Sequence, residues 1–167
     1  MRLVSASLSL IGLAAAGLLW WLLAGLIGEP RGAANMAMRL GLGLAALLPA
    51  LIVLAAMILA HMLLRFASGA FDPLAGRDGR LLAVNQRVIG NTIEQMALFA
   101  PALLAWAAGA GPGEMRWVIA LGPVFAAARL AFWAGYLIDP MARAAGMAPS
   151  FVASLVAIGA AALAWAG

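Results

Sequence analysis

Five long apolar stretches limit what this chain can fold into more than any other feature of its sequence. Only α-helices and closed β-barrels satisfy their backbone hydrogen bonds in lipid, and a helix needs about 20 apolar residues to cross the hydrocarbon core. None of the stretches shows the alternating pattern of barrel strands. We therefore predict an all-α fold, an integral membrane helical bundle, with helices over residues 3–27, 40–64, 88–109, 117–138 and 149–166.

The composition agrees with a membrane protein and excludes several kinds of site. Hydrophobic residues make up 66% of the 167 residues and charged residues 10%, whereas soluble domains average about 45–50% and about 25%. Cysteine is absent, so disulfides, thiolate metal sites and cysteine nucleophiles are excluded. His61 is the single histidine, and we expect an interfacial residue there rather than a metal ligand.

All ten basic residues are arginines, and six acidic residues reduce the net charge to +4. The arginines form no basic run with an exposed aromatic platform, so we expect no nucleic-acid partner. In a membrane protein, arginines in short loops indicate the cytoplasmic side. An N-terminus inside and a C-terminus outside puts six arginines on the inner side and three on the outer, namely Arg2, Arg65, Arg77, Arg80, Arg87 and Arg143 against Arg31, Arg39 and Arg116.

The first stretch could also be a cleaved signal peptide, since Arg2 precedes it. However, the apolar run 3–27 is longer than the roughly 7–15 residues of a signal's apolar core, and the segment 18–23 is bulkier than a cleavage region. We favour a retained transmembrane helix.

Three polar residues lie at the start of the third stretch. Arg87, Asn91 and Glu94 are spaced i, i+4, i+7, which places them on one face of a helix. An ionisable side chain at the centre of a membrane costs roughly 2.5–3.5 kcal/mol on insertion scales. Such residues therefore usually face the interior of a bundle or a wet cavity.

The fourth stretch carries a comparable row in Arg129, Phe132 and Tyr136. Two interpretations of the two rows remain open. In one, Glu94 pairs with Arg129 and Asn91 bonds across the bundle, so the polar residues are structural. In the other, both rows line a polar pocket for a charged ligand at the cytoplasmic end.

Two segments resemble motifs of the MAPEG family, the membrane-associated proteins in eicosanoid and glutathione metabolism that include microsomal glutathione transferases. Arg87-x-x-x-Asn91-x-x-Glu94 is similar to the Arg-x-x-x-Asn-x-x-Glu at the start of the family's second helix. The segment Ala128–Tyr136, with Arg143 after it, resembles the family's third-helix element and the arginine that follows.

The resemblance implies a four-helix subunit in a homotrimer, with glutathione bound between neighbouring subunits on the cytoplasmic side. It covers the chain from about residue 40 onward. We therefore expect residues 1–32 to form an additional N-terminal transmembrane helix and turn, and residues 33–167 to form a four-helix MAPEG-like domain. For a bacterial-type member, the membrane would be the inner, cytoplasmic membrane.

The resemblance also implies roles for individual residues by their place in the motifs. Arg143 and Tyr136 would lie nearest the sulfur of glutathione, with Arg143 stabilising its thiolate. Arginine forks and one glutamate complement the two carboxylates and the ammonium group of glutathione. The residues that would hold this peptide are Arg65, Arg87, Asn91, Glu94 and Arg129.

Three positions depart from the pattern of the family's catalytic members. Phe132 stands where those members often have tyrosine, Gln95 where they have an aromatic residue, and Ile89 where they have a polar one. Each change alters the hydrogen-bonding groups or the aromatic surface of the implied site.

We expect a membrane-bound, glutathione-dependent transferase or peroxidase that activates the glutathione thiol for attack on a lipophilic electrophile or a lipid hydroperoxide. One alternative is a non-catalytic protein of the same fold, in which the polar residues form a structural network. Another is a small transporter, which the absence of an internal repeat and of a broken mid-membrane helix disfavours.

Overall fold

The computed structural model describes residues 2–72, 76 and 78–166. These residues form helices and their connections, with no strand among them. All five long helices are apolar enough to cross a membrane, so the chain is an integral membrane protein and the predicted all-α bundle is confirmed. The helices are α1 (Arg2–Ile27), α2 (Met36–Ser68), α3 (Arg80–Gly109), α4 (Met115–Ile138) and α5 (Ala144–Ala166), with a short 3-10 turn η1 (Pro112–Glu114) before α4.

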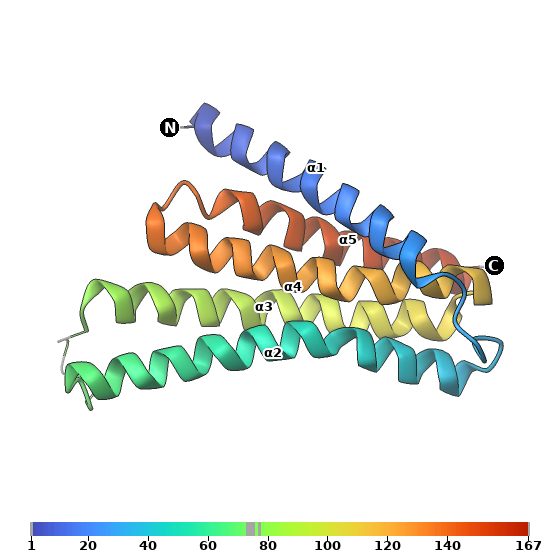
Figure 1. Ribbon diagram of the computed structural model, residues 1–167, viewed down its shortest axis with the longest axis horizontal. Helices are drawn as coiled ribbons and strands as arrows, with labels where there is room; N and C mark the ends of the chain where they lie inside the picture. The colour runs from blue at the N-terminus through green and yellow to red at the C-terminus, as the bar shows by residue number, and fades with distance from the viewer. Residues whose placement is uncertain (1, 73–75, 77, 167) are drawn as a thin grey trace.

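Four helices form the bundle and the fifth lies against its outside (Figure 1). α2 packs on α3 and α4, and α5 packs on α3 and α4. α1 contacts α4 and α5 but neither α2 nor α3. The expected architecture of a four-helix core with one additional N-terminal helix is therefore confirmed.

The helices extend beyond the apolar stretches that predicted them. α2 begins four residues earlier than expected because Asn35 caps it, its side-chain oxygen accepting a hydrogen bond from the amide of Ala37 at 2.8 Å. α3 begins at Arg80 rather than at residue 88. Hydropathy marks only the segment in hydrocarbon, whereas a helix continues until its backbone is capped. Arg87 thus lies inside α3, two turns after its start.

α5 also begins early, at Ala144 instead of Pro149, and its first turns lie directly on α4. A β-carbon at Gly146 would overlap the backbone of Phe132 and Ala128, so only glycine permits this approach. Small residues at helix contacts let the backbones come close, which is a main source of packing energy in a membrane.

The helix connections and the two chain termini lie at opposite ends of the bundle (Figure 1). One end, which we call the N-terminal end, carries the start of α1 and the α2–α3 and α4–α5 connections; the other carries the C-terminus and the remaining two connections. Of the arginines used for the orientation, Arg77 lies outside the described residues, as does Pro73 of the same connection.

Candidate functional site

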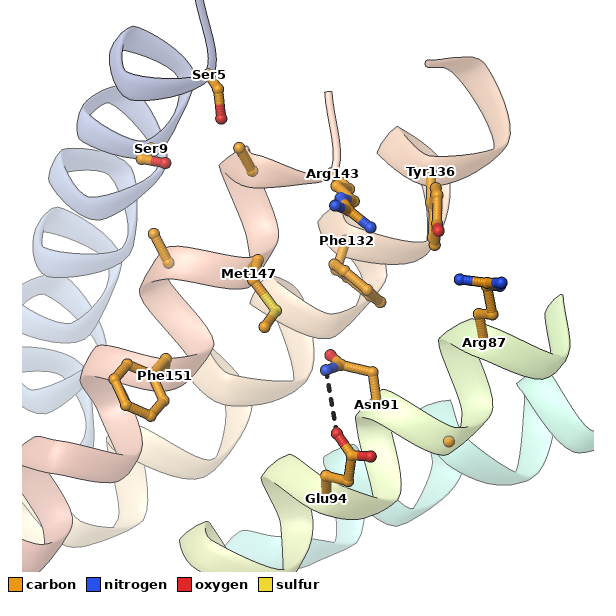
Figure 2. Close-up of a pocket in the computed structure, with 13 residues that line it drawn as sticks. Ser5, Ser9, Arg87, Asn91, Glu94, Phe132, Tyr136, Arg143, Met147 and Phe151 are labelled. Atoms are coloured by element: carbon orange, nitrogen blue, oxygen red, sulfur yellow. Dashed lines mark hydrogen bonds between the residues drawn. The ribbon is translucent and has the colours of Figure 1, made fainter. Parts of the chain in front are cut away.

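A cavity of about 660 Å³ lies at the N-terminal end of the bundle (Figure 2). Its volume falls within the range of roughly 300–1,000 Å³ that is usual for small-molecule sites. Side chains of α1, α3, α4, α5 and the α4–α5 connection line it: Ser5, Ser9, Arg87, Gly90, Asn91, Glu94, Phe132, Tyr136, Arg143, Ala144, Met147, Ala148 and Phe151. Five of the seven predicted site residues are therefore brought together.

The row on α3 forms the polar wall of this cavity. Arg87 and Glu94 are exposed and Asn91 is half-buried. The Asn91 side-chain nitrogen lies 3.5 Å from a Glu94 carboxylate oxygen (Figure 2). The Arg87 guanidinium has no hydrogen-bond or ion-pair partner in the described part of the chain. Both charges on this wall are thus available to a ligand.

Tyr136 and Arg143 form the facing wall. The Arg143 guanidinium carbon lies 4.9 Å from the centre of the Tyr136 ring, a cation–π arrangement. The Phe132 and Tyr136 ring centres are 5.8 Å apart. The guanidinium of Arg143 makes no hydrogen bond to any described residue. The tyrosine ring therefore supports the arginine while its N–H donors remain free for an anion.

Arg129 lies beneath the cavity rather than in its lining, because its side chain is 0% exposed. It donates to the Thr92 hydroxyl at 2.8 and 3.2 Å, to the Ser150 hydroxyl at 3.1 Å and to the Asn91 side-chain oxygen at 3.0 Å. These acceptors come from α3 and α5, so one guanidinium on α4 joins three helices.

The ion pair between Glu94 and Arg129, which belonged to one of the two interpretations left open by the sequence, is absent among the described residues. Glu94 is exposed on the cavity side of α3, whereas the guanidinium of Arg129 points inward to Thr92 and Ser150. In the described ranges, the one ion pair of a guanidinium with a carboxylate joins Arg65 to Asp78. The bond of Asn91 across the bundle is present, with Arg129 as its donor.

This buried arginine also fixes the orientation of the Asn91 amide. A guanidinium has only donors, so the atom of Asn91 that faces it is the oxygen. The amide nitrogen is then turned toward Glu94 and the cavity. The cavity therefore receives a donor from Asn91 between the cation of Arg87 and the anion of Glu94.

Arg65 does not line the cavity of its own chain. It lies in the last turn of α2 and holds Asp78 through two contacts, at 3.0 and 3.3 Å. It also donates to the Ala70 carbonyl at 2.8 Å, and one of its nitrogens lies 3.5 Å from the ring of His61. In this chain Arg65 fastens the end of α2 to the connection that precedes α3.

The three departures from the family pattern fall in different surroundings. Phe132 lines the cavity, so the hydroxyl of a tyrosine there is missing from its wall. Gln95 and Ile89 are buried and do not line the cavity of this chain. Only one of the three therefore changes the chemistry of this cavity directly.

Several residues of the site were not predicted. Thr92 and Ser150 hold Arg129, and Met147 and Phe151 form an apolar floor. The serines of α1 that line the cavity follow the i, i+4 spacing of a helix face, which was the available signal for them.

Comparison with known proteins agrees with this geometry. The sequence profile of the MAPEG family matches residues 41–163, which includes most of α2 and of α5 with both helices between them, and leaves α1 outside. Searches of curated proteins and of solved structures return no match. Since the profile covers well over half of the 167 residues, the chain belongs to the MAPEG family.

Proposed function

We propose that this protein binds glutathione in the cavity at its N-terminal end and uses the thiol in a transferase or peroxidase reaction. The observation that carries the proposal is the charge pattern of one cavity. Two guanidinium groups that make no hydrogen bond or ion pair with any described residue, on Arg87 and Arg143, line it together with one exposed carboxylate, on Glu94. The MAPEG family includes glutathione transferases, and its members use glutathione.

This pattern fits the charges of the tripeptide. Glutathione carries two carboxylates and one ammonium group, and guanidinium forks bind carboxylates in a bidentate manner. We assign Arg87 to a carboxylate and Glu94 to the ammonium group. The Asn91 amide nitrogen, directed by Arg129, donates to a peptide oxygen between them.

Arg143 and Tyr136 are assigned to the sulfur. Glutathione supplies a nucleophilic sulfur, and a free thiol has a pKa of about 8.5, which a neighbouring guanidinium lowers. The Tyr136 ring holds the Arg143 guanidinium in place from one side. Because the floor of the cavity is apolar, the attraction between cation and thiolate is screened less than it is in water.

Two outcomes of sulfur attack are open to such a site. With an electrophile, a carbon–sulfur bond forms and the leaving group departs with its electron pair. With a hydroperoxide, the sulfur takes the distal oxygen, the O–O bond breaks and an alcohol leaves after protonation. A second glutathione thiol then gives the disulfide and water.

We further propose a homotrimer in the inner membrane of a bacterium, with the N-terminus inside and the site on the cytoplasmic side. The arginine count supports the orientation. In such a trimer, Arg65 would serve a neighbouring chain's site and would exchange Asp78 for the ligand. Residues 1–32 would form a separate N-terminal unit beside the catalytic domain 33–167, since the family profile begins only at residue 41.

Purified protein in detergent should bind glutathione by calorimetry and conjugate it to a chlorinated nitroaromatic. Absence of both binding and turnover would overturn the proposal. Native mass spectrometry with glutathione added tests the trimer in the same preparation.

A non-catalytic role remains a second candidate, favoured by the wholly buried Arg129 and its bonds to three helices. Arg143→Ala separates the two candidates. In an enzyme this change lowers turnover and leaves assembly intact, because the side chain is exposed and bonds to no described residue. In a structural module there is no turnover to lose.

A further inference from the structure

The helix that lies outside the family profile forms one wall of the cavity. Ser5 and Ser9 of α1 line it on the side away from Arg87, and Met147 and Phe151 of α5 lie between the two sides (Figure 2). The cavity thus has a charged side formed by α3 and a side of hydroxyl groups formed by α1, with an apolar floor between them.

The hydroxyls of Ser5 and Ser9 bond to nothing in the described part of the chain. The wholly buried hydroxyls of α3 and α5 behave differently. Thr92, Ser150 and Ser154 each donate to the carbonyl four residues earlier, at 2.8, 2.9 and 3.1 Å. Such back-bonding is the usual way to satisfy a hydroxyl within a helix. Two half-buried hydroxyls without it are donors available to a ligand.

The same face of α1 continues into a second cavity. Ser5, Ser9, Leu13 and Gly17 follow one another at intervals of four residues. Leu13 and Gly17 line a cavity of about 200 Å³ between α1, α4 and α5, with an apolar lining that includes Trp20, Val152 and Val156. A molecule that lies along this face meets hydroxyl groups first and hydrocarbon afterwards.

Two contacts fix α1 in this place. A β-carbon at Gly12 would overlap the carbonyl of Ala145, so this glycine lets α1 lie directly on the start of α5. About two turns later, the Trp20 indole donates to the Trp117 carbonyl at 2.9 Å, and the two rings meet edge to face at 5.3 Å. α1 is thereby held on both α4 and α5.

We propose that α1 and α5 bind the lipophilic co-substrate as a single-chain amphiphile, which rests on the proposed function of the adjoining cavity. Its hydrogen-bond-accepting reactive group lies at Ser5 and Ser9, and its hydrocarbon chain lies along Leu13 and Val152. The second cavity is below the volume of a complete small-molecule site, so it suits one chain rather than the two chains of a phospholipid. A hydroperoxide of a long-chain fatty acid has this chemistry.

The first test compares a double variant, Ser5→Ala with Ser9→Ala, with the control Ser7→Ala. Ser7 lies on the same helix but is exposed and lines neither cavity. The double variant should raise the KM for a long-chain fatty-acid hydroperoxide roughly tenfold, since two hydrogen bonds are lost. Glutathione binding and turnover of a chlorinated nitroaromatic should remain within about twofold. An equal effect on both substrates, or none on either, overturns the proposal.

The second test fills the apolar cavity. A β-carbon at Gly17 or at Gly25 meets no atom within 4 Å, and only Gly17 lines the cavity. Gly17→Leu should raise the KM for the long-chain hydroperoxide and leave that for cumene hydroperoxide unchanged, whereas Gly25→Leu should change neither. If both variants act alike, the chain does not lie there.

A direct binding measurement separates this proposal from the proposed function. A photoreactive diazirine fatty acid, added without glutathione, should label peptides of α1 and α5, and a long-chain hydroperoxide should compete with it. Labelling without any glutathione turnover refutes the proposed function and supports the lipid site. Turnover with labelling elsewhere refutes the lipid site. Complete competition by a phospholipid indicates a bilayer lipid only and also overturns the proposal.

Discussion

Arg129 and Asn91 form a donor–acceptor pair between α4 and α3, with a guanidinium nitrogen 3.0 Å from the side-chain oxygen. One partner is wholly buried and the other lines the cavity. The buried guanidinium of Arg129 therefore fixes the orientation of the Asn91 side chain in the cavity wall. Arg129 is a positioning residue, and Asn91 is the residue that would contact a ligand.

Arg129→Lys should test this assignment. Lysine keeps the charge but lacks the planar fork, so it cannot reach Asn91, Thr92 and Ser150 together. We expect a protein that still assembles, with the KM for glutathione raised about tenfold and kcat little changed. Steady-state kinetics on detergent-purified protein measure both constants.

Thr92→Val is the matched control, because it removes an acceptor of Arg129 and leaves Asn91 untouched. It should lower thermal stability, by about 1–3 kcal/mol for a donor left unsatisfied, without a comparable change in KM. If Thr92→Val raises the KM as much as Arg129→Lys does, the effect is general loosening and not positioning.

Arg143 and Arg87 should differ in the kinetic constant that they control. Removal of a group that stabilises developing charge typically costs about 10²–10³ in kcat, so Arg143→Ala should chiefly lower kcat. Arg87→Ala removes a ligand contact that the ground state already makes and should chiefly raise the KM for glutathione. Equal effects of the two changes on kcat would refute the assignment of Arg143 to the sulfur.

Phe132→Tyr should strengthen glutathione binding. It places a hydroxyl in the cavity wall at the position where the family's catalytic members often have tyrosine. One added hydrogen bond is worth about 0.5–1.5 kcal/mol, so we expect the Kd measured by calorimetry to fall by roughly 2- to 10-fold. Phe151→Tyr, also in the lining but on α5, should leave the Kd unchanged.

Arg65 gives a test of the proposed trimer. Its pair with Asp78 is partly exposed, with side chains 20% and 27% accessible, and such pairs contribute about 0–1 kcal/mol. Asp78→Asn should therefore shift the melting temperature only slightly. If Arg65 binds glutathione in a neighbouring chain, Arg65→Ala should raise the KM while Asp78→Asn does not. A KM unchanged in both variants leaves Arg65 with its structural role alone.

The sequence predicted the helices well because hydrocarbon imposes a length and a polarity on each of them. It predicted the row on α3 equally well, since three polar residues on one helical face must point away from lipid. It failed where the outcome depends on which helices become neighbours. The spacing left open whether Glu94 pairs with Arg129, and the structure shows that Arg129 instead donates to Thr92 of α3 and Ser150 of α5.

The helix starts and the role of α1 could not be predicted for related reasons. Hydropathy does not register the polar first turns of α3, because they lie outside the apolar segment that it detects. The serines of α1 line the cavity because Gly12 lets α1 lie on Ala145 of α5, and no periodicity within α1 predicts that contact. Packing between helices, rather than the pattern along one helix, decides these features.

Gly146 allows that packing to be tested directly. Gly146→Ala places a methyl group onto the backbone of Phe132 and Ala128, so α5 must move away from α4. Overpacking of this kind costs about 1–3 kcal/mol, which thermal unfolding in detergent should detect. The shift should also loosen Ser150, one turn further along α5, and with it the hydrogen bond that Ser150 accepts from Arg129.

Gly159→Ala on the same helix is the control, because its β-carbon meets no atom within 4 Å, and it should leave stability and glutathione binding unchanged. Equal melting temperatures for the two variants would show that α4 and α5 are not in the close contact on which the site depends.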